Sequence, residues 1–136
     1  MSHSTYGTFS MGVADTATMK NNRFVYVNSD GNVDLPDATD DAEVLAIVGT
    51  TVTQVTPAGD VAVRPIGGGK TQVTVAASET VAPGDKLVLT GNAGCVKTGN
   101  TGWVVGIACD GATSGASEPA VISAVLRNPY SVASGT

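Results

Sequence analysis

The sequence predicts an all-β fold, and three observations support this class. Glycine is abundant (17 residues), aromatic residues make up 4% and charged residues 14%, a composition that favours many short strands with tight turns. Apolar residues either alternate with polar ones or form short runs bounded by Gly, Pro, Asn and Asp. One pattern of strand, turn and buried strand occurs twice. The length of 136 residues suits a single domain.

The repeat covers two predicted units, residues 21–66 and 84–128, joined by a connecting strand in residues 70–83. Equivalent residues lie 63 positions apart, as Arg23 and Lys86 do. The spacing falls to 60 positions across the second polar loop and then returns to 63. Two copies of one β unit, with a single change of loop length, would produce this register.

Turn residues divide the first unit into its elements. Residues 29–32 (Ser-Asp-Gly-Asn) form a predicted hairpin turn, and Pro36 ends the returning strand because proline cannot donate to the ladder. An acidic loop follows over residues 37–43. The predicted strands, alternating or continuously apolar, are residues 21–27, 33–35, 43–48, 51–55 and 61–63.

The second unit follows three consecutive glycines, Gly67–Gly69. Residues 76–83 suit either a short helical turn or an extended crossing, and residues 111–119 form a predicted surface loop. Asn128-Pro129 should end the last strand. The predicted strands, again by alternation or a short apolar run, are residues 71–75, 86–90, 103–108 and 120–126.

Two terminal segments fall outside the predicted β domain of residues 21–128. Residues 129–136 form a loose C-terminal tail. Residues 1–20 show no persistent period, so they are either a disordered tail or an extended N-terminal arm that orders on a partner. Tyr6, Phe9 and Met11 are the candidate contact residues of such an arm.

Charge and composition exclude several partners and compartments. The net charge is −5 and the seven basic residues are scattered, whereas nucleic-acid binding needs a basic patch. No segment resembles a secretory signal or a membrane span, so we expect a chain that stays in a reducing cytoplasm. Cys95 and Cys109 are expected to be free thiols, with a bridge as the alternative. Trp103 is expected in the core.

Motifs for cofactors and metals are incomplete. Gly67–Thr71 resembles the end of a phosphate loop, but Arg64 stands where its first glycine should be and a strand pattern follows. Asp30, Asn32 and Asp34 resemble the start of a calcium loop that lacks its later glycine and glutamate. We therefore expect no cofactor and no dedicated metal site; the alternative is a weak surface cation site using Asp37, Asp40 and Asp41.

Catalytic constellations are not apparent. His3 is the single histidine and lies near the N-terminus, so a histidine base, a catalytic triad or a multi-histidine zinc site is not expected. The carboxylates are concentrated in turns, and no residue near Cys109 in the sequence would activate its thiol. The chain is therefore expected not to be an enzyme.

Taken in order, the segments RFVYVNSDGNV, VLAIVG, GDVAVRPIG, VAPGDKLVLTGNAG, WVVGIA and VISAVLRNP resemble the small head-decoration (cement) proteins of tailed bacteriophages. The resemblance covers roughly residues 20–128 and rests on turns and apolar positions. It implies a compact β-barrel or β-tulip-like domain on the outer surface of the virion, assembled in the host cytoplasm. It also implies a trimer that bridges neighbouring major capsid proteins, and it carries no catalytic residues.

The alternative function is a carbohydrate- or ligand-binding β module on the surface of a virion. Such a module needs a groove with several exposed aromatic residues, which an aromatic content of 4% makes difficult to build. Saturable binding on a glycan array would favour it.

Overall fold

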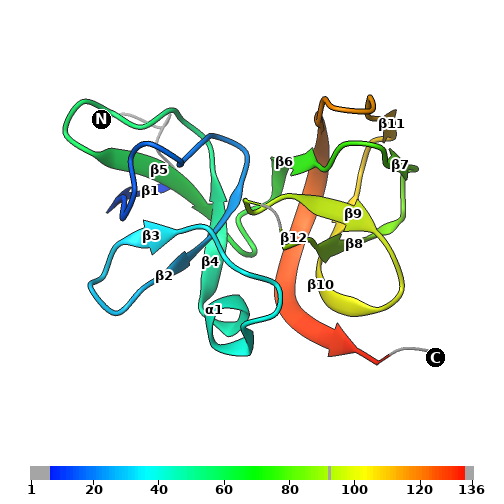
Figure 1. Cartoon of the computed structure of the whole chain (residues 1–136), viewed down its shortest axis with the longest axis horizontal. Coiled ribbons are helices and arrows are strands. Elements are labelled where there is room, and N and C mark those ends of the chain that lie inside the picture. The colour runs from blue at the N-terminus through cyan, green and yellow to red at the C-terminus, as the bar shows by residue number, and fades with distance from the viewer. Residues whose placement is uncertain (1–6, 92, 134–136) are drawn as a thin grey trace.

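The computed structural model describes residues 7–91 and 93–133, and it confirms the all-β class. Two large sheets lie side by side (Figure 1). The first sheet has five strands in the order β1-β5-β4-β2-β3. Their bounds are β1 Phe9–Gly12, β5 Asp60–Pro65, β4 Ile47–Thr51, β2 Phe24–Val27 and β3 Val33–Asp34.

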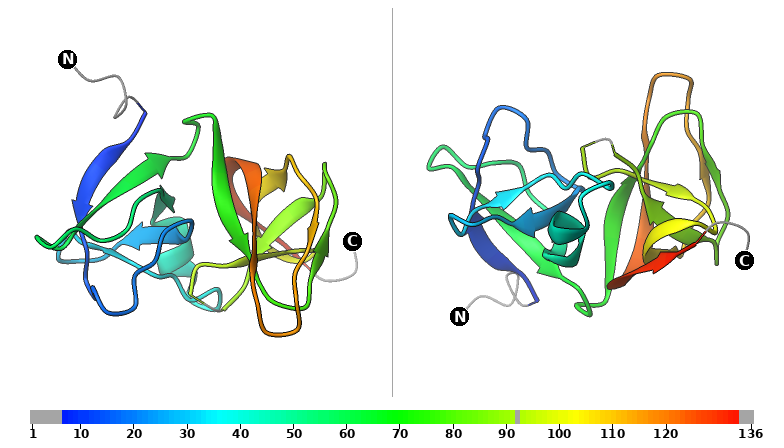
Figure 2. Two further views of the ribbon diagram at one scale, coloured as in Figure 1. Left: turned by 90° about the horizontal axis from the view of Figure 1, so that it is seen from above. Right: turned by 60° about the horizontal axis from the view of Figure 1, so that its bottom comes forward.

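The second sheet closes on itself into a five-stranded barrel, with the order β10-β12-β6-β9-β8. Its strand β6 lies on the side that faces the first sheet (Figures 1 and 2). A further two-stranded sheet pairs β11 (Ala112–Thr113) with β7 (Thr80–Val81). The barrel strands are β10 Gly102–Ala108, β12 Ala120–Val132, β6 Lys70–Val75, β9 Val96–Thr98 and β8 Lys86–Leu89.

The two large sheets have the same topology. Reading β1, β5, β4, β2 and β3 as counterparts of β6, β12, β10, β8 and β9 gives the same strand order in both. The second sheet is closed by parallel pairing of β6 with β9, and in the first sheet a single parallel bridge joins Val13, just after β1, to Val33 of β3. Ala76 N donates to Val96 O at 2.9 Å in the barrel, and Ala14 N donates to Val33 O at 3.0 Å in the first sheet. The first sheet is therefore an incompletely closed barrel. We call it the first barrel, and the closed barrel the second.

The boundaries of these units differ from the predicted ones. Residues 9–12 were expected in an arm, yet they form β1 and pair antiparallel with β5. Met19, also in the expected arm, is 5% exposed in the core of the first barrel. The predicted strand of residues 71–75 is confirmed as β6, but it is the first strand of the second barrel and the counterpart of β1 rather than a connection between two units.

A short helix replaces part of the predicted strand of residues 43–48. Helix α1 spans Asp41–Leu45, and strand β4 begins only at Ile47. The Asp40 carboxylate starts the helix by accepting hydrogen bonds from Ala42 N (3.1 Å) and Glu43 N (3.4 Å). This cap decides the local structure because it satisfies backbone donors that a strand would pair with a neighbour.

The last strand was predicted to end at Asn128-Pro129, but β12 continues to Val132. Leu126 pairs with Gly106, and the next recorded pair joins Tyr130 to Val104. The residues between these two pairs form a bulge, which leaves them outside the ladder. Pro129 lies in this bulge, so the ladder loses no hydrogen bond from its missing N–H. Part of the expected C-terminal tail is thus strand.

The core of the second barrel extends into the first. Phe24, Val44 and Ile47 of the first barrel belong to the same buried cluster as the interior valines and leucines of the second. A separate cluster, which includes Val25 and Val63, fills the first barrel. Among the described residues no helix is long and apolar enough to cross a bilayer.

Hydrogen bonds fix the junction between the barrels. Phe24 N donates to Gly94 O at 3.1 Å, and both the N–H and the hydroxyl of Thr74 donate to Asn22 O, at 3.0 and 2.9 Å. The Thr50 and Thr71 hydroxyls, both buried, lie 3.2 Å apart. Because these groups are paired across the junction, separating the barrels would leave several polar groups without partners.

Replacing Gly94 by alanine should destabilise the whole domain. Gly94 has φ +73°, and an added Cβ would lie 2.5 Å from Phe24 O, so the variant combines backbone strain with a clash at the junction. We expect a loss of about 1–3 kcal/mol in the free energy of unfolding, measured by chemical denaturation.

Gly91→Ala is the matched control. It lies in the same turn, and no atom comes within 4 Å of its added Cβ. Its effect should stay within about 0.5 kcal/mol. Equal effects from the two variants would contradict the role assigned to the junction.

Candidate functional site

The predicted contact residues fall in or next to β1. Phe9 is 37% exposed, and Met11 is half-buried against the interior cluster of the first barrel. Tyr6 lies outside the described residues. Phe9 pairs with Val63 and Met11 with Val61, two residues of β5 that line the barrel interior. The Phe9 and Met11 side chains therefore lie on the interior side of the sheet.

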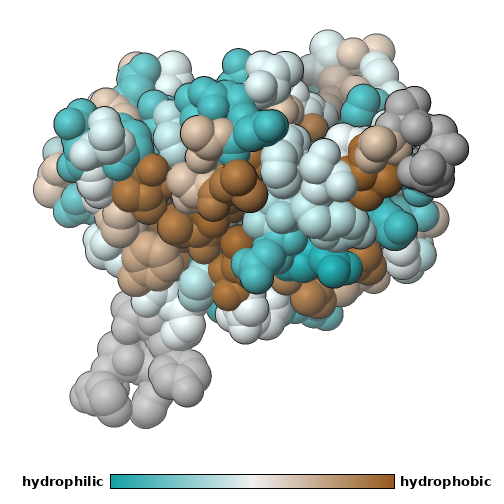
Figure 3. All heavy atoms as spheres, turned by 90° about the horizontal axis from the view of Figure 1, so that it is seen from below, coloured by the Kyte–Doolittle hydropathy of each residue, from teal (hydrophilic) through white to brown (hydrophobic). Residues whose placement is uncertain are grey.

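Phe9 lies at one end of the first barrel, and this end is apolar. The register places the start of β1, the end of β5, the start of β4 and the end of β2 at the same edge. Val27, the last residue of β2, and Val48, near the start of β4, lie towards this edge and are half-buried against the interior cluster of the first barrel. Figure 3 shows hydrophobic residues gathered on this half of the face seen from below. We call this surface the open end of the first barrel, defined by Phe9, Val27 and Val48.

A second set of exposed apolar side chains lies on the outside of the second barrel. Val121 and Val125 on β12 are 49% and 46% exposed. Their cross-strand neighbours are mixed: Val125 pairs with Ile107 on one side and Lys70 on the other. These valines are therefore separated by polar neighbours, unlike the side chains at the open end of the first barrel.

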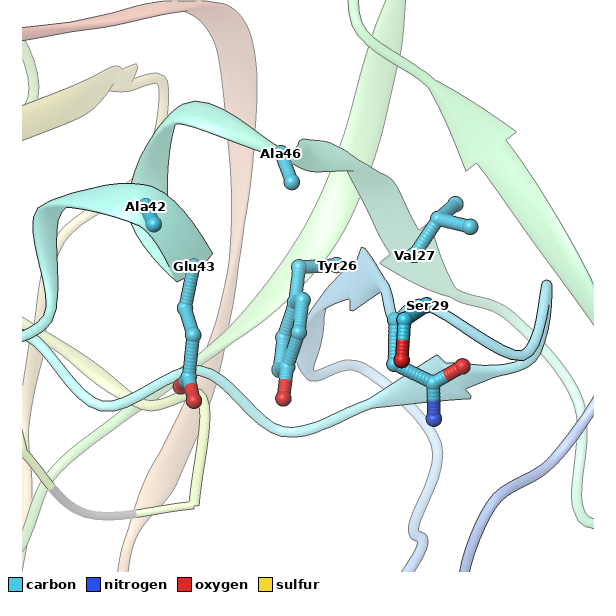
Figure 4. A pocket seen from close by; sticks show the side chains of 7 residues that line it. Tyr26, Val27, Ser29, Ala42, Glu43 and Ala46 are labelled. Carbon is cyan, nitrogen blue, oxygen red and sulfur yellow. The ribbon is translucent and has the colours of Figure 1, made fainter.

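A shallow depression of about 290 Å³ lies between β2 and α1. Figure 4 shows Tyr26 on its wall, between Glu43 of the helix and Ser29 of the turn after β2. The pKa of Tyr26 is raised to about 12, mainly by burial and then by the charge of Glu43 and the hydrogen bond that Glu43 accepts from the hydroxyl. More distant charges on Asp34 and Asp40 act in the same direction.

The acidic loop uses its carboxylates within the protein. Asp37 accepts from the N–H and hydroxyl of Thr39, at 2.9 and 2.8 Å, and this bonding lowers its pKa. Asp40 caps α1, and Asp41 accepts from Trp103 Nε1 at 3.2 Å. Within the part of the chain that the structure describes, no group of His, Cys, Asp and Glu is arranged to hold a metal ion.

The thiols and the tryptophan also serve the fold. Cys95 and Cys109 are free. Cys95 is buried, and desolvation raises the pKa of its thiol although the nearby Arg23 opposes the rise, so the thiolate is disfavoured. Trp103 is half-buried against the shared core and hydrogen-bonds across the two barrels through Asp41.

Two surface features could not be located from the sequence. The Tyr26–Glu43 depression depends on α1. The apolar residues in this segment predicted a strand there, so the helix was missed. The exposure of Val121 and Val125 follows from period-two alternation in β12, a signal that was present but gives no sign of which face is covered.

Tyr26 should titrate well above an ordinary tyrosine. Its pKa is about 12, whereas the reference value is 10.0. At pH values between the two, the folded chain keeps a proton that the unfolded chain loses. Stability should therefore decline as pH rises through that interval. Tyrosine-selective NMR titration would measure the pKa, and Glu43→Gln should lower it; an unchanged value would show that Glu43 does not contribute.

Comparison with known proteins adds no assignment. A search against models of protein families finds none that matches the chain, and a search of curated proteins finds no similar sequence.

Proposed function

We propose that the chain is a structural binding protein that decorates the outside of an expanded phage head and stabilises it by bridging major capsid proteins. The observation that carries this proposal is the open end of the first barrel, where Phe9, at the start of β1, is 37% exposed. The likeness of the strand-and-turn pattern to cement proteins supports the same function. In this proposal the virion surface is the site of action, and copies associate as trimers.

The physical mechanism is selective binding to one lattice. A protein that binds the expanded shell but not the unexpanded one stabilises the expanded shell by mass action, by about 2.7 kcal/mol per site at a hundredfold excess over Kd. Contacts repeated by symmetry across the shell add through multivalency. A rigid pair of barrels suits this task because little conformational entropy is lost on binding.

The described residues favour a binding role over an enzyme or a glycan module. The Asp37 and Asp40 carboxylates are engaged in a turn and a helix cap, and the Cys95 thiol is buried. The depression is lined by a single aromatic residue, Tyr26, whereas stacking against a sugar chain usually needs several. Saturable binding on a glycan array would overturn this preference.

Phe9→Ser should weaken binding to expanded shells of the cognate major capsid protein. Loss of an aromatic contact at the centre of an interface typically costs more than 1 kcal/mol, so we expect at least about a fivefold weaker binding in co-sedimentation. Unexpanded shells should bind neither form.

Val121→Ser is the matched control, because Val121 is 49% exposed on the other barrel. It should bind as the parent chain does, and the unfolding transition of both variants should be checked first. Equal binding by Phe9→Ser and the parent chain would remove the open end of the first barrel from the contact. Truncating residues 2–19 is a poorer test, since it also removes β1 and Met19.

A further inference from the structure

The depression between β2 and α1 has the features of a small binding site. It measures about 290 Å³, near the lower limit for ligand pockets, so it suits a side chain or a small molecule rather than a large ligand. One part of its wall is apolar and another is polar. The apolar wall comes from Val27, Ala42 and Ala46, and the polar wall from Tyr26, Asn28, Ser29 and Glu43.

The electrostatic field at this depression is negative. The charged groups that act on the Tyr26 hydroxyl are all carboxylates, namely Glu43, Asp34 and Asp40. Residues 9–65 carry eight of the twelve acidic residues and three of the seven basic ones, so the net charge of −5 belongs to the first barrel. A concave surface lined by one sign of charge concentrates counter-ions of the other sign.

The two described tyrosines differ in what lies near their rings. Arg127 stands over the Tyr130 ring at 4.6 Å from its centroid, a cation–π contact within the chain. Tyr26 has a carboxylate beside it instead, and Glu43 directs only Oε1 to a backbone donor, Asp37 N, at 2.8 Å. Glu43 also accepts a hydrogen bond from the Tyr26 hydroxyl, but an ionised carboxylate has about four lone-pair sites, so it keeps acceptor capacity for a cation beside Tyr26.

We propose that this depression binds an organic cation, a primary ammonium or guanidinium group on a short alkyl stem. The stem packs against Ala42, Ala46 and Val27, and the cationic group lies between the Tyr26 ring and the Glu43 carboxylate. A lysine or arginine side chain of another protein and a free alkylamine share this chemistry. The inference is independent of the proposed function, because it concerns the isolated chain.

NMR titration of the full chain with butylammonium and butylguanidinium would test the site. Both probes should give saturable shifts at the amides of residues 26–29 and 42–46, while butanol and butyrate should not. No saturable shift with either cation, or equal shifts with butanol, would overturn the proposal. N-acetyl-lysine amide and N-acetyl-arginine amide would then distinguish the sources: binding as tight as that of the butyl probes indicates a protein side chain, and markedly weaker binding indicates a free amine.

Matched variants locate the charge that is needed. Glu43→Gln keeps the shape and an acceptor for Asp37 N, and it should weaken butylammonium binding about tenfold, as loss of one charge-assisted hydrogen bond does. Glu118→Gln makes the same charge change at an exposed position of the second barrel and should leave binding unchanged. Equal affinities for Glu43→Gln and the parent chain, with native amide spectra for both, would refute the proposed site.

Discussion

The burial of Phe24 at the junction of the two barrels is the interaction on which the structure depends. Its side chain is fully buried in a cluster made mostly by the second barrel, while its N–H donates to Gly94 O. Each barrel has a small interior built largely from valine, and burying one such side chain yields only about 1.5–3 kcal/mol. Burying Phe24, Val44 and Ile47 in the core of the second barrel lets the two barrels stabilise each other, as small units otherwise bury too little surface.

Alternation in the sequence was sufficient to predict the class and most of the strands, because it records which side chains a half-buried strand must bury. The alternating residues 51–55 were predicted as a strand, but β4 ends at Thr51 and residues 52–55 are irregular. Local chemistry overrode the pattern in two further places. The Asp40 cap turns an apolar run into α1, and a bulge lets β12 pass through Pro129. The cap is a local signal, Asp40 followed three residues later by Glu43, that competes with the apolar pattern, whereas the bulge depends on the strand with which β12 pairs.

The candidate surfaces were harder to predict than the strands. β1 pairs with β5, about fifty residues away along the chain, so its membership of a sheet has no local sign. The exposure of Phe9 is in turn a consequence of where β1 ends in the register. Hydrophobicity identifies residues able to bind a partner, but only the arrangement of the strands decides which of them the fold itself covers.

The two barrels share a topology and differ in surface chemistry. The first carries the excess of acidic residues, the apolar open end and the depression beside Tyr26, whereas the second has four acidic and four basic residues in residues 70–132. Internal strand order is constrained by the shared core, while the outward side chains are not. A duplicated scaffold can therefore present two unlike faces in a fixed orientation, so a partner that engages the first barrel also determines the direction in which the second one points.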